Sequence, residues 1–141
     1  MLFVDTNVFI CYLTNVPPRH GEQALAFLSD LAEGSVTATT TESVLVEVIQ
    51  VLQSKKGLAY PRADISREIA TFLEFRGLRI ENRALHIRAL ARYASTNLDY
   101  VDCLLIEYAN GPEDAVVSFD QDYDRVNEKP RVEPRADLAN R

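Results

Sequence analysis

The segment "LFVDTNVFI", residues Leu2–Ile10, decides the fold of this chain. Its first three residues are apolar and predict a short strand that is buried on both faces. Asp5, Thr6 and Asn7 end the apolar run with residue types that favour a turn or a helix N-cap. In open α/β sheets, ligands bind at the carboxyl ends of the strands. Asp5 is therefore either a residue of a ligand site or the cap of the helix that follows.

The rest of the chain alternates between helical periodicity and short apolar runs. The runs "SVTATT", "LRI" and "AVVSFD" predict further strands, and a short edge strand is expected around Val132. This alternation is typical of an α/β domain with a parallel sheet and right-handed crossovers. We expect one domain over residues 1–141, with an irregular tail over about 130–141.

Capping residues and glycines predict where the helices begin and end. Thr39 and Glu42 have the spacing of a capping box, and Asp64 is expected to cap the following helix. One later helix is predicted from Asn82 to Ser95, and the next, in "LDYVDCLLIEYANG", ends at Gly111. The helix after Thr39 has the clearest pattern, because its apolar residues share one face: Leu45, Val48, Ile49 and Leu52.

The composition is that of a globular chain with a sizeable core. Hydrophobic residues make up 47% of the 141 residues, and no run approaches the roughly 18 apolar residues of a membrane-spanning helix. The first residues also lack the pattern of a signal peptide, so we expect a cytoplasmic protein. Cys11 and Cys103 lack the spacing of a metal site and are expected to be reduced thiols in the core.

The charge restricts the kind of nucleic-acid chemistry that is possible. The chain has 21 acidic residues against 15 Lys and Arg, and its formal net charge is −6. This charge argues against a non-specific attraction to nucleic acid. Because bound divalent cations would offset part of it, the charge does not exclude a phosphate substrate.

Four acidic residues occupy positions that are expected to face the same edge of the sheet. Asp5 and Asp120 end predicted strands, whereas Glu47 and Asp102 interrupt apolar stretches of predicted helices. Asp99 and Asp122 lie close to two of these residues and are expected to support them: the pairs are Asp99 with Asp102 and Asp122 with Asp120. Each residue also has an ordinary interpretation, as an exposed helix residue for Glu47, a helix cap for Asp99 and turn residues for Asp120 and Asp122.

A cluster of carboxylates needs protons or cations to be stable. Two like charges about 4 Å apart repel by roughly 4 kcal/mol at an effective dielectric constant near 20. Carboxylate oxygens without His or Cys select hard cations, which indicates Mg²⁺ or Mn²⁺. Thr6, Ser35 and Ser118 have no partnered histidine in a recognisable motif, so a Ser-His-Asp hydrolase is not expected.

Four segments together resemble the PIN-domain ribonucleases, and within them the VapC-type toxins of toxin–antitoxin pairs. The segments are "VDTNVFI", "ESVLVEVIQVL", "LDYVDCLLIEYA" and "VVSFDQDYD", in the order of the family and spanning nearly the whole chain. The resemblance implies a three-layer α/β/α domain with a central parallel sheet of four to five short strands. It also implies metal-binding or catalytic roles for four acids: Asp5, Glu47, Asp102 and Asp120. Asn7 and Ser118 are implied to support the site by hydrogen bonding.

The same resemblance implies a function and its partners. The function is that of a Mg²⁺-dependent endoribonuclease toxin, in which metal-activated water attacks RNA phosphodiester bonds. The partners are an antitoxin protein and a second copy of the chain, and apolar positions of the early helices are candidates for these surfaces: Phe9, Tyr12, Leu13 and Phe27. The alternative is a catalytically inactive PIN-fold protein whose acidic pocket binds a partner.

Two other acidic α/β folds are disfavoured by the sequence. A response-regulator receiver usually has a lysine after a late strand, and none follows "AVVSFD" before Lys129. A haloacid-dehalogenase-type phosphatase has Asp-x-Asp after its first strand, whereas the third residue here is Asn7.

Overall fold

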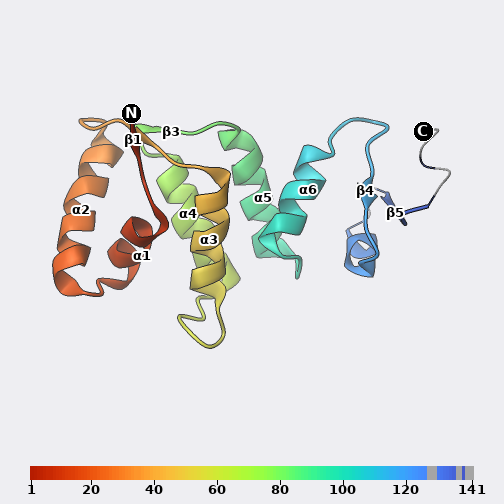
Figure 1. Ribbon diagram of the computed structural model, residues 1–141, viewed down its shortest axis with the longest axis horizontal. Coiled ribbons are helices and arrows are strands. Elements are labelled where there is room, and N and C mark those ends of the chain that lie inside the picture. Colours follow the sequence, from red (N-terminus) through yellow and green to blue (C-terminus); the bar gives the residue numbers. More distant parts are fainter. Residues whose placement is uncertain (127–129, 136–137, 139–141) are drawn as a thin grey trace.

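Helices and short strands alternate along the chain in the computed structural model, which describes residues 1–126, 130–135 and 138. Figure 1 shows the elements laid out from the red N-terminal end to the blue C-terminal end. Their bounds are β1 (Leu2–Phe3), α1 (Thr6–Thr14), α2 (Pro18–Glu33), β2 (Ala38–Thr39), α3 (Glu42–Gln53), α4 (Arg62–Leu73), β3 (Leu78–Arg79), α5 (Arg83–Ser95), α6 (Tyr100–Tyr108), β4 (Val116–Val117), the 3₁₀ helix η1 (Gln121–Arg125) and β5 (Arg131–Val132).

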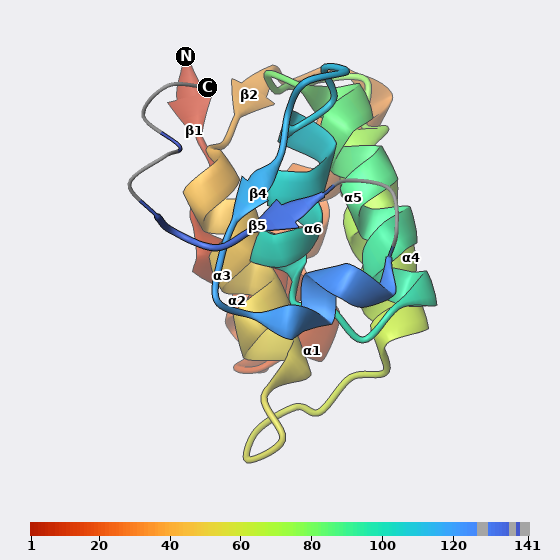
Figure 2. The same ribbon diagram turned by 90° about the vertical axis from the view of Figure 1, so that its right-hand side faces the viewer.

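The strands are parallel, as expected for an α/β domain, but they form two sheets. One sheet has the order β1-β2-β3, and the other pairs β4 with β5. The sequence predicted a single central sheet of four to five strands, whereas the structure has one sheet of three strands and one of two. In Figures 1 and 2, β4 and β5 lie beyond α6, at the end of the molecule opposite α2. Two backbone hydrogen bonds pair β4 with β5: Val116 N–H donates to Pro130 O and Ser118 N–H donates to Val132 O, both at 3.0 Å.

Strand β1 lies at the edge of the three-stranded sheet. Leu2 is 55% exposed and Phe3 71% exposed, whereas Val4 is buried. The prediction that all three residues are buried on both faces is wrong for the first two. The physical reason is that, among the described strands, β1 pairs only with β2, so one side of β1 stays uncovered.

The core lies among the helices and confirms the predicted apolar stripe of α3. All four stripe residues are buried: Leu45, Val48, Ile49 and Leu52. An aromatic cluster lies beside them, in which the Phe72 ring is 4.7 Å from that of Phe9 and 5.6 Å from that of Phe75. Phe9 is only 1% exposed and serves the core, so its prediction as an exposed association residue is wrong. The other three candidates are half-buried against the core: Tyr12, Leu13 and Phe27.

Two predicted caps lie elsewhere. The N-cap of α3 is Thr41, whose hydroxyl accepts a hydrogen bond from Val44 N–H at 3.3 Å. Thr39 cannot cap the helix because it pairs with the neighbouring strands in β2. Asp64 lies in the first turn of α4, and the N-cap of that helix is Pro61.

Gly77 fixes the junction between α2 and the strands β2 and β3. Its N–H donates to Leu31 O at 2.9 Å, and its carbonyl accepts from Ala38 N–H at 3.0 Å. A Cβ at this position would lie 1.9 Å from Val36 O and 2.8 Å from Leu31 O. Only glycine lets the three backbone segments approach this closely.

Both cysteines are free thiols, as predicted. Cys103 is buried and Cys11 is half-buried. Burial raises the pKa of the Cys103 thiol to about 11, so this thiol stays protonated near neutral pH. No helix within the described part of the chain has the length and apolar character needed to cross a membrane.

Candidate functional site

Asp5 and Glu47 are connected through Thr6, the first residue of α1. Asp5 has an extended backbone and occupies the N-cap position of α1, yet its exposed side chain makes no capping hydrogen bond. Thr6, the next residue, is buried, and its Oγ1 donates to Glu47 Oε2 at 2.7 Å. This bond joins the start of α1 to the middle of α3 and orients the exposed Glu47 carboxylate.

Asp102 and Asp120 are connected through η1. Tyr123 Oη donates to Asp102 Oδ1 at 2.7 Å, which joins η1 to the first turn of α6. Asp120 is the N-cap of η1, and its Oδ1 accepts from Asp122 N–H at 2.9 Å. Ser118 supports this turn, because its Oγ accepts from Asp120 N–H at 2.9 Å. Asp120 therefore acts as a turn residue here and stays exposed.

The other supporting candidates lie in different surroundings. Asp99 is the exposed N-cap of α6 and makes no side-chain capping bond. Asp122 is exposed and lies 3.6 Å from the Arg125 guanidinium. Asn7 lines a pocket beside β1 and has no hydrogen bond to the acidic residues within the described part of the chain.

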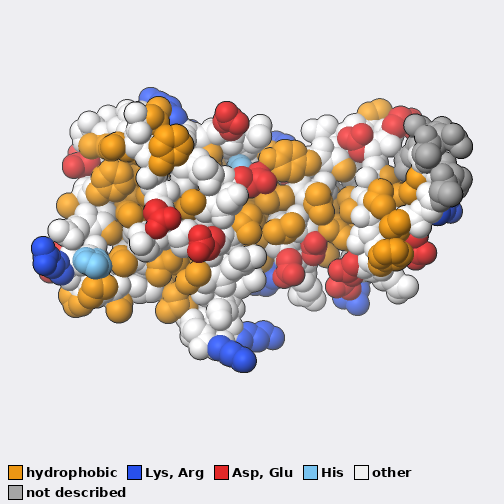
Figure 3. All heavy atoms as spheres, in the orientation of Figure 1, with side chains coloured by type: hydrophobic (Ala, Val, Ile, Leu, Met, Phe, Trp, Pro, Cys, Tyr) orange, Lys and Arg blue, Asp and Glu red, His pale blue; other side chains and the backbone are white. Residues whose placement is uncertain are grey.

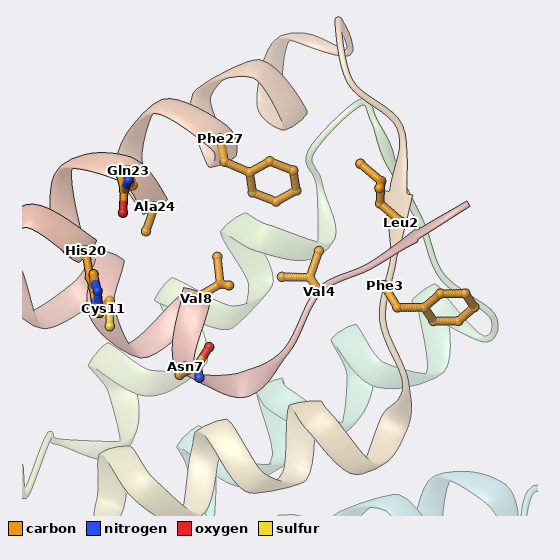
Figure 4. Close-up of a pocket in the computed structure, with 10 residues that line it drawn as sticks. All are labelled: Leu2, Phe3, Val4, Asn7, Val8, Cys11, His20, Gln23, Ala24 and Phe27. Atoms are coloured by element: carbon orange, nitrogen blue, oxygen red, sulfur yellow. The ribbon is translucent and has the colours of Figure 1, made fainter.

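That pocket is apolar and lies between β1, α1 and α2. Figure 4 shows Val4, Val8 and Phe27 around its centre, with Asn7 at the start of α1 and Cys11 farther along the same helix. Its volume is about 510 Å³. The exposed Leu2 and Phe3 extend its lining to the edge of the sheet. The pocket therefore offers apolar surface close to Asp5 in the sequence.

These hydrogen bonds relate the acidic residues two by two, which we call the first acidic pair (Asp5 and Glu47, through Thr6) and the second acidic pair (Asp102 and Asp120, through Tyr123 of η1). Their oxygen ligands are of the type that a hard divalent cation prefers. However, the described residues contain no group of three or more His, Cys, Asp or Glu side chains placed to hold a metal ion. The donor chemistry of the four carboxylates fits a hard divalent cation, although the described residues show no group of three ligands already brought together.

A second polar cluster surrounds His86, which is 1% exposed. Its Nδ1 lies 2.9 Å from Tyr100 Oη, and its Nε2 lies 3.5 Å from Glu42 Oε2. Tyr108 Oη donates to the same Glu42 oxygen at 2.5 Å. Burial lowers the pKa of His86, and the Glu42 carboxylate opposes this change. His86 is therefore held neutral by its surroundings.

The surface shows no continuous basic track on the face in Figure 3. Acidic side chains are spread among apolar ones over the middle and right of that face, and Lys and Arg side chains gather at the tip of the loop that projects below α3. The loop, residues 54–61, contains Lys55 and Lys56.

Two residues that contact the acids were not predicted as site residues. From the sequence, Thr6 is considered only as a nucleophile that lacks a partnered histidine. Tyr123 is aromatic, and little in its segment indicates that its hydroxyl would bind one of the neighbouring acids. The position of Thr6 directly after Asp5 was the available signal for the first. A signal for Tyr123 was its place in "DQDYD", where a tyrosine stands among four polar residues.

Comparisons with known proteins add a family match. The sequence profile of the PIN domain matches residues 2–129. No curated protein matches the chain.

Proposed function

The chain belongs to the PIN-domain family, and on that basis we propose that it is an endoribonuclease that hydrolyses RNA phosphodiester bonds with Mg²⁺ or Mn²⁺. PIN domains are generally nucleases and typically use divalent metals. The observation that carries the proposal is that the matched segment includes all four acids: Asp5, Glu47, Asp102 and Asp120.

The hydrogen bonds around the acids support this proposal. A buried hydroxyl orients one carboxylate of each pair, Glu47 from Thr6 and Asp102 from Tyr123. A serine-hydrolase mechanism has no such support. The Thr6 hydroxyl donates to a carboxylate, and the buried His86 contacts Tyr100 and Glu42 rather than a serine in the described part of the chain.

The proposal predicts that single neutral substitutions of the four acids remove cleavage without unfolding the chain. We expect Asp5→Asn, Glu47→Gln, Asp102→Asn and Asp120→Asn each to lower cleavage by about 100-fold or more, the effect of removing a group that stabilises transition-state charge. The fold should persist because these side chains are exposed or half-buried. The measurement is cleavage of a fluorophore–quencher RNA, with thermal unfolding measured in parallel.

A matched control is Glu22→Gln, which neutralises an exposed carboxylate on α2. It should cleave like the wild type. Excess chelator should stop cleavage, and Mg²⁺ or Mn²⁺ should restore it. Full activity in chelator, or variants that unfold while their folded fraction retains full specific activity, would contradict the proposal.

We further propose that the nuclease is the VapC-type toxin of a toxin–antitoxin pair. The four motif segments support this assignment, and the apolar pocket beside β1 offers a surface for apolar residues of an antitoxin. Induction of the chain alone should arrest growth, and Asp5→Asn should not. If both arrest growth equally, the inactive PIN-fold interaction protein becomes the better assignment.

A further inference from the structure

The hydroxyl of Tyr123 is the contact that distinguishes Asp102 from the other acids. Tyr123 is 4% exposed, and its Oη donates to Asp102 Oδ1 at 2.7 Å. Asp102 is half-buried in the first turn of α6. No other hydrogen bond or ion pair reaches its carboxylate from the residues that the structure describes. The orientation of this carboxylate therefore depends on one phenol group.

The same tyrosine belongs to the turn that carries Asp120. Asp120 accepts the N–H of Asp122 at 2.9 Å, and Tyr123 follows directly in η1. Between α6 and η1, the Tyr123 hydroxyl thus connects two acids of the proposed site that come from separate elements. Removal of the hydroxyl would free the Asp102 side chain to rotate and would loosen the contact of the Asp120 turn with α6.

The protonation of Tyr123 suits a permanent donor. A phenol is a hydrogen-bond donor that ordinarily keeps its proton to about pH 10. The phenol therefore keeps its proton under the conditions in which the protein would act. The bond fixes the position of Oδ1, and with it the direction in which Oδ2 points.

We propose that Tyr123 is a positioning residue for the nuclease reaction, acting through Asp102. The inference rests on the proposed function and names a residue outside the acidic set. Groups that orient a functional side chain typically change activity by about 10-fold to 100-fold when they are removed. The change should fall on kcat, because Tyr123 is buried and its side chain is therefore not accessible to a bound RNA.

The test is Tyr123→Phe, which keeps the ring and removes the hydroxyl. The matched control is Tyr93→Phe, because Tyr93 is also buried and its hydroxyl donates to a side-chain oxygen, Gln53 Oε1 at 2.8 Å. Both variants should remain folded by circular dichroism. We expect Tyr123→Phe to lower kcat about 10-fold or more with an unchanged KM, and Tyr93→Phe to leave both constants at wild-type values.

A second measurement separates positioning from a general effect on folding. Thermal unfolding of Tyr123→Phe, Asp102→Asn and the double variant should give shifts in Tm that are not additive, because both substitutions break the same bond. Tyr93→Phe combined with Asp102→Asn should be additive.

The outcomes distinguish this inference from the proposed function. A wild-type chain that cleaves no RNA overturns both. An active wild type with a fully active Tyr123→Phe variant, or with additive shifts for Tyr123 and Asp102, overturns the role of Tyr123 alone. A loss of activity that is equal in Tyr93→Phe would also contradict it.

Discussion

Tyrosine and threonine hydroxyls fix the polar side chains of this protein one residue at a time. Thr6 holds Glu47, Tyr123 holds Asp102, and Tyr100 contacts the buried His86. A hydroxyl can serve a carboxylate or an imidazole without carrying charge into the core, where an unpaired charge would be costly. His86 is the residue where this arrangement affects stability as a function of pH.

We predict that acid destabilises the folded protein through His86. In the folded state the pKa of His86 lies below its ordinary value of 6.5, so the unfolded chain binds a proton more readily. The stability associated with neutral His86 is present above about pH 6.5 and is lost as the pH falls through 6.5 toward the lowered pKa. Urea unfolding at pH 7.5 and at pH values between about 5 and 6.5 measures this loss.

The controls use the two histidines of the chain. His86→Gln should flatten the dependence of the unfolding free energy on pH in this range. His20→Gln should retain the wild-type dependence, because His20 is exposed. Identical pH profiles for the wild type and His86→Gln would rule out His86 as the origin.

At the scale of elements, Arg62 connects two helices to the turn that precedes α6, the helix that carries Asp102. It begins α4, and its Nε donates to Tyr93 O at 2.8 Å, while its Nη2 donates to Leu98 O. The guanidinium also lies 3.7 Å from the centre of the Tyr93 ring. One side chain thereby connects α4, the end of α5 and the turn before α6.

We predict that Arg62→Ala lowers the free energy of unfolding by about 2–4 kcal/mol, since two carbonyls lose a charged donor and the ring loses its cation. Arg62→Lys should recover only part of this, because one ammonium cannot reproduce the planar fork of donors. Arg67→Ala, which removes a solvent-exposed pair with Asp64, should cost less than about 1 kcal/mol. Chemical denaturation of the three variants measures the differences, and equal losses for positions 62 and 67 would contradict this role.

Element type could be predicted from the sequence far better than element pairing. The stripe of α3 repeats over several turns, so one apolar face determines both the helix and its burial. The strands have two residues each, such as Val116–Val117, and so short a segment contains no information about its partner. The division into two sheets and the exposure of Phe3 follow from that pairing.

The roles of the candidate site residues stay predictions. The four acids stand out because carboxylates interrupt apolar segments, as Asp102 does in "YVDCLL". Asp120 follows β4, and the sequence does not specify that β4 pairs with β5 rather than with the first sheet. The place of Tyr123 among the polar residues of "DQDYD" is only a weak signal, because a buried tyrosine has the same pattern whether its hydroxyl is bonded to a carboxylate or to water.

At the scale of the whole molecule, exposed apolar residues at the β1 edge bear on association. Leu2 and Phe3 are consecutive exposed residues of β1, and both line the apolar pocket. Exposed apolar surface of this kind often marks an interface. The core position of Phe9 moves the expected contact from the early helices to this edge.

We predict a homodimer at micromolar concentration in sedimentation velocity, and a shift to monomer in Phe3→Glu because the substitution places charge in the contact. Phe119→Glu is the matched control: its side chain is equally exposed, but it follows β4 in the second sheet. It should remain a dimer. A wild type that stays monomeric, or equal effects of the two substitutions, would contradict this interface.

The close packing at Gly77 has a consequence for how the sequence can diverge. Leu31 O and Val36 O leave no space for any side chain there, so every substitution must move backbone. Over evolutionary time this position is expected to stay fixed for reasons of assembly alone, regardless of what the protein does. Descendants that lost their chemistry would be free to vary at Asp5 and Asp102 but would still keep glycine at 77, so invariance at that position is a record of shared ancestry rather than of shared activity.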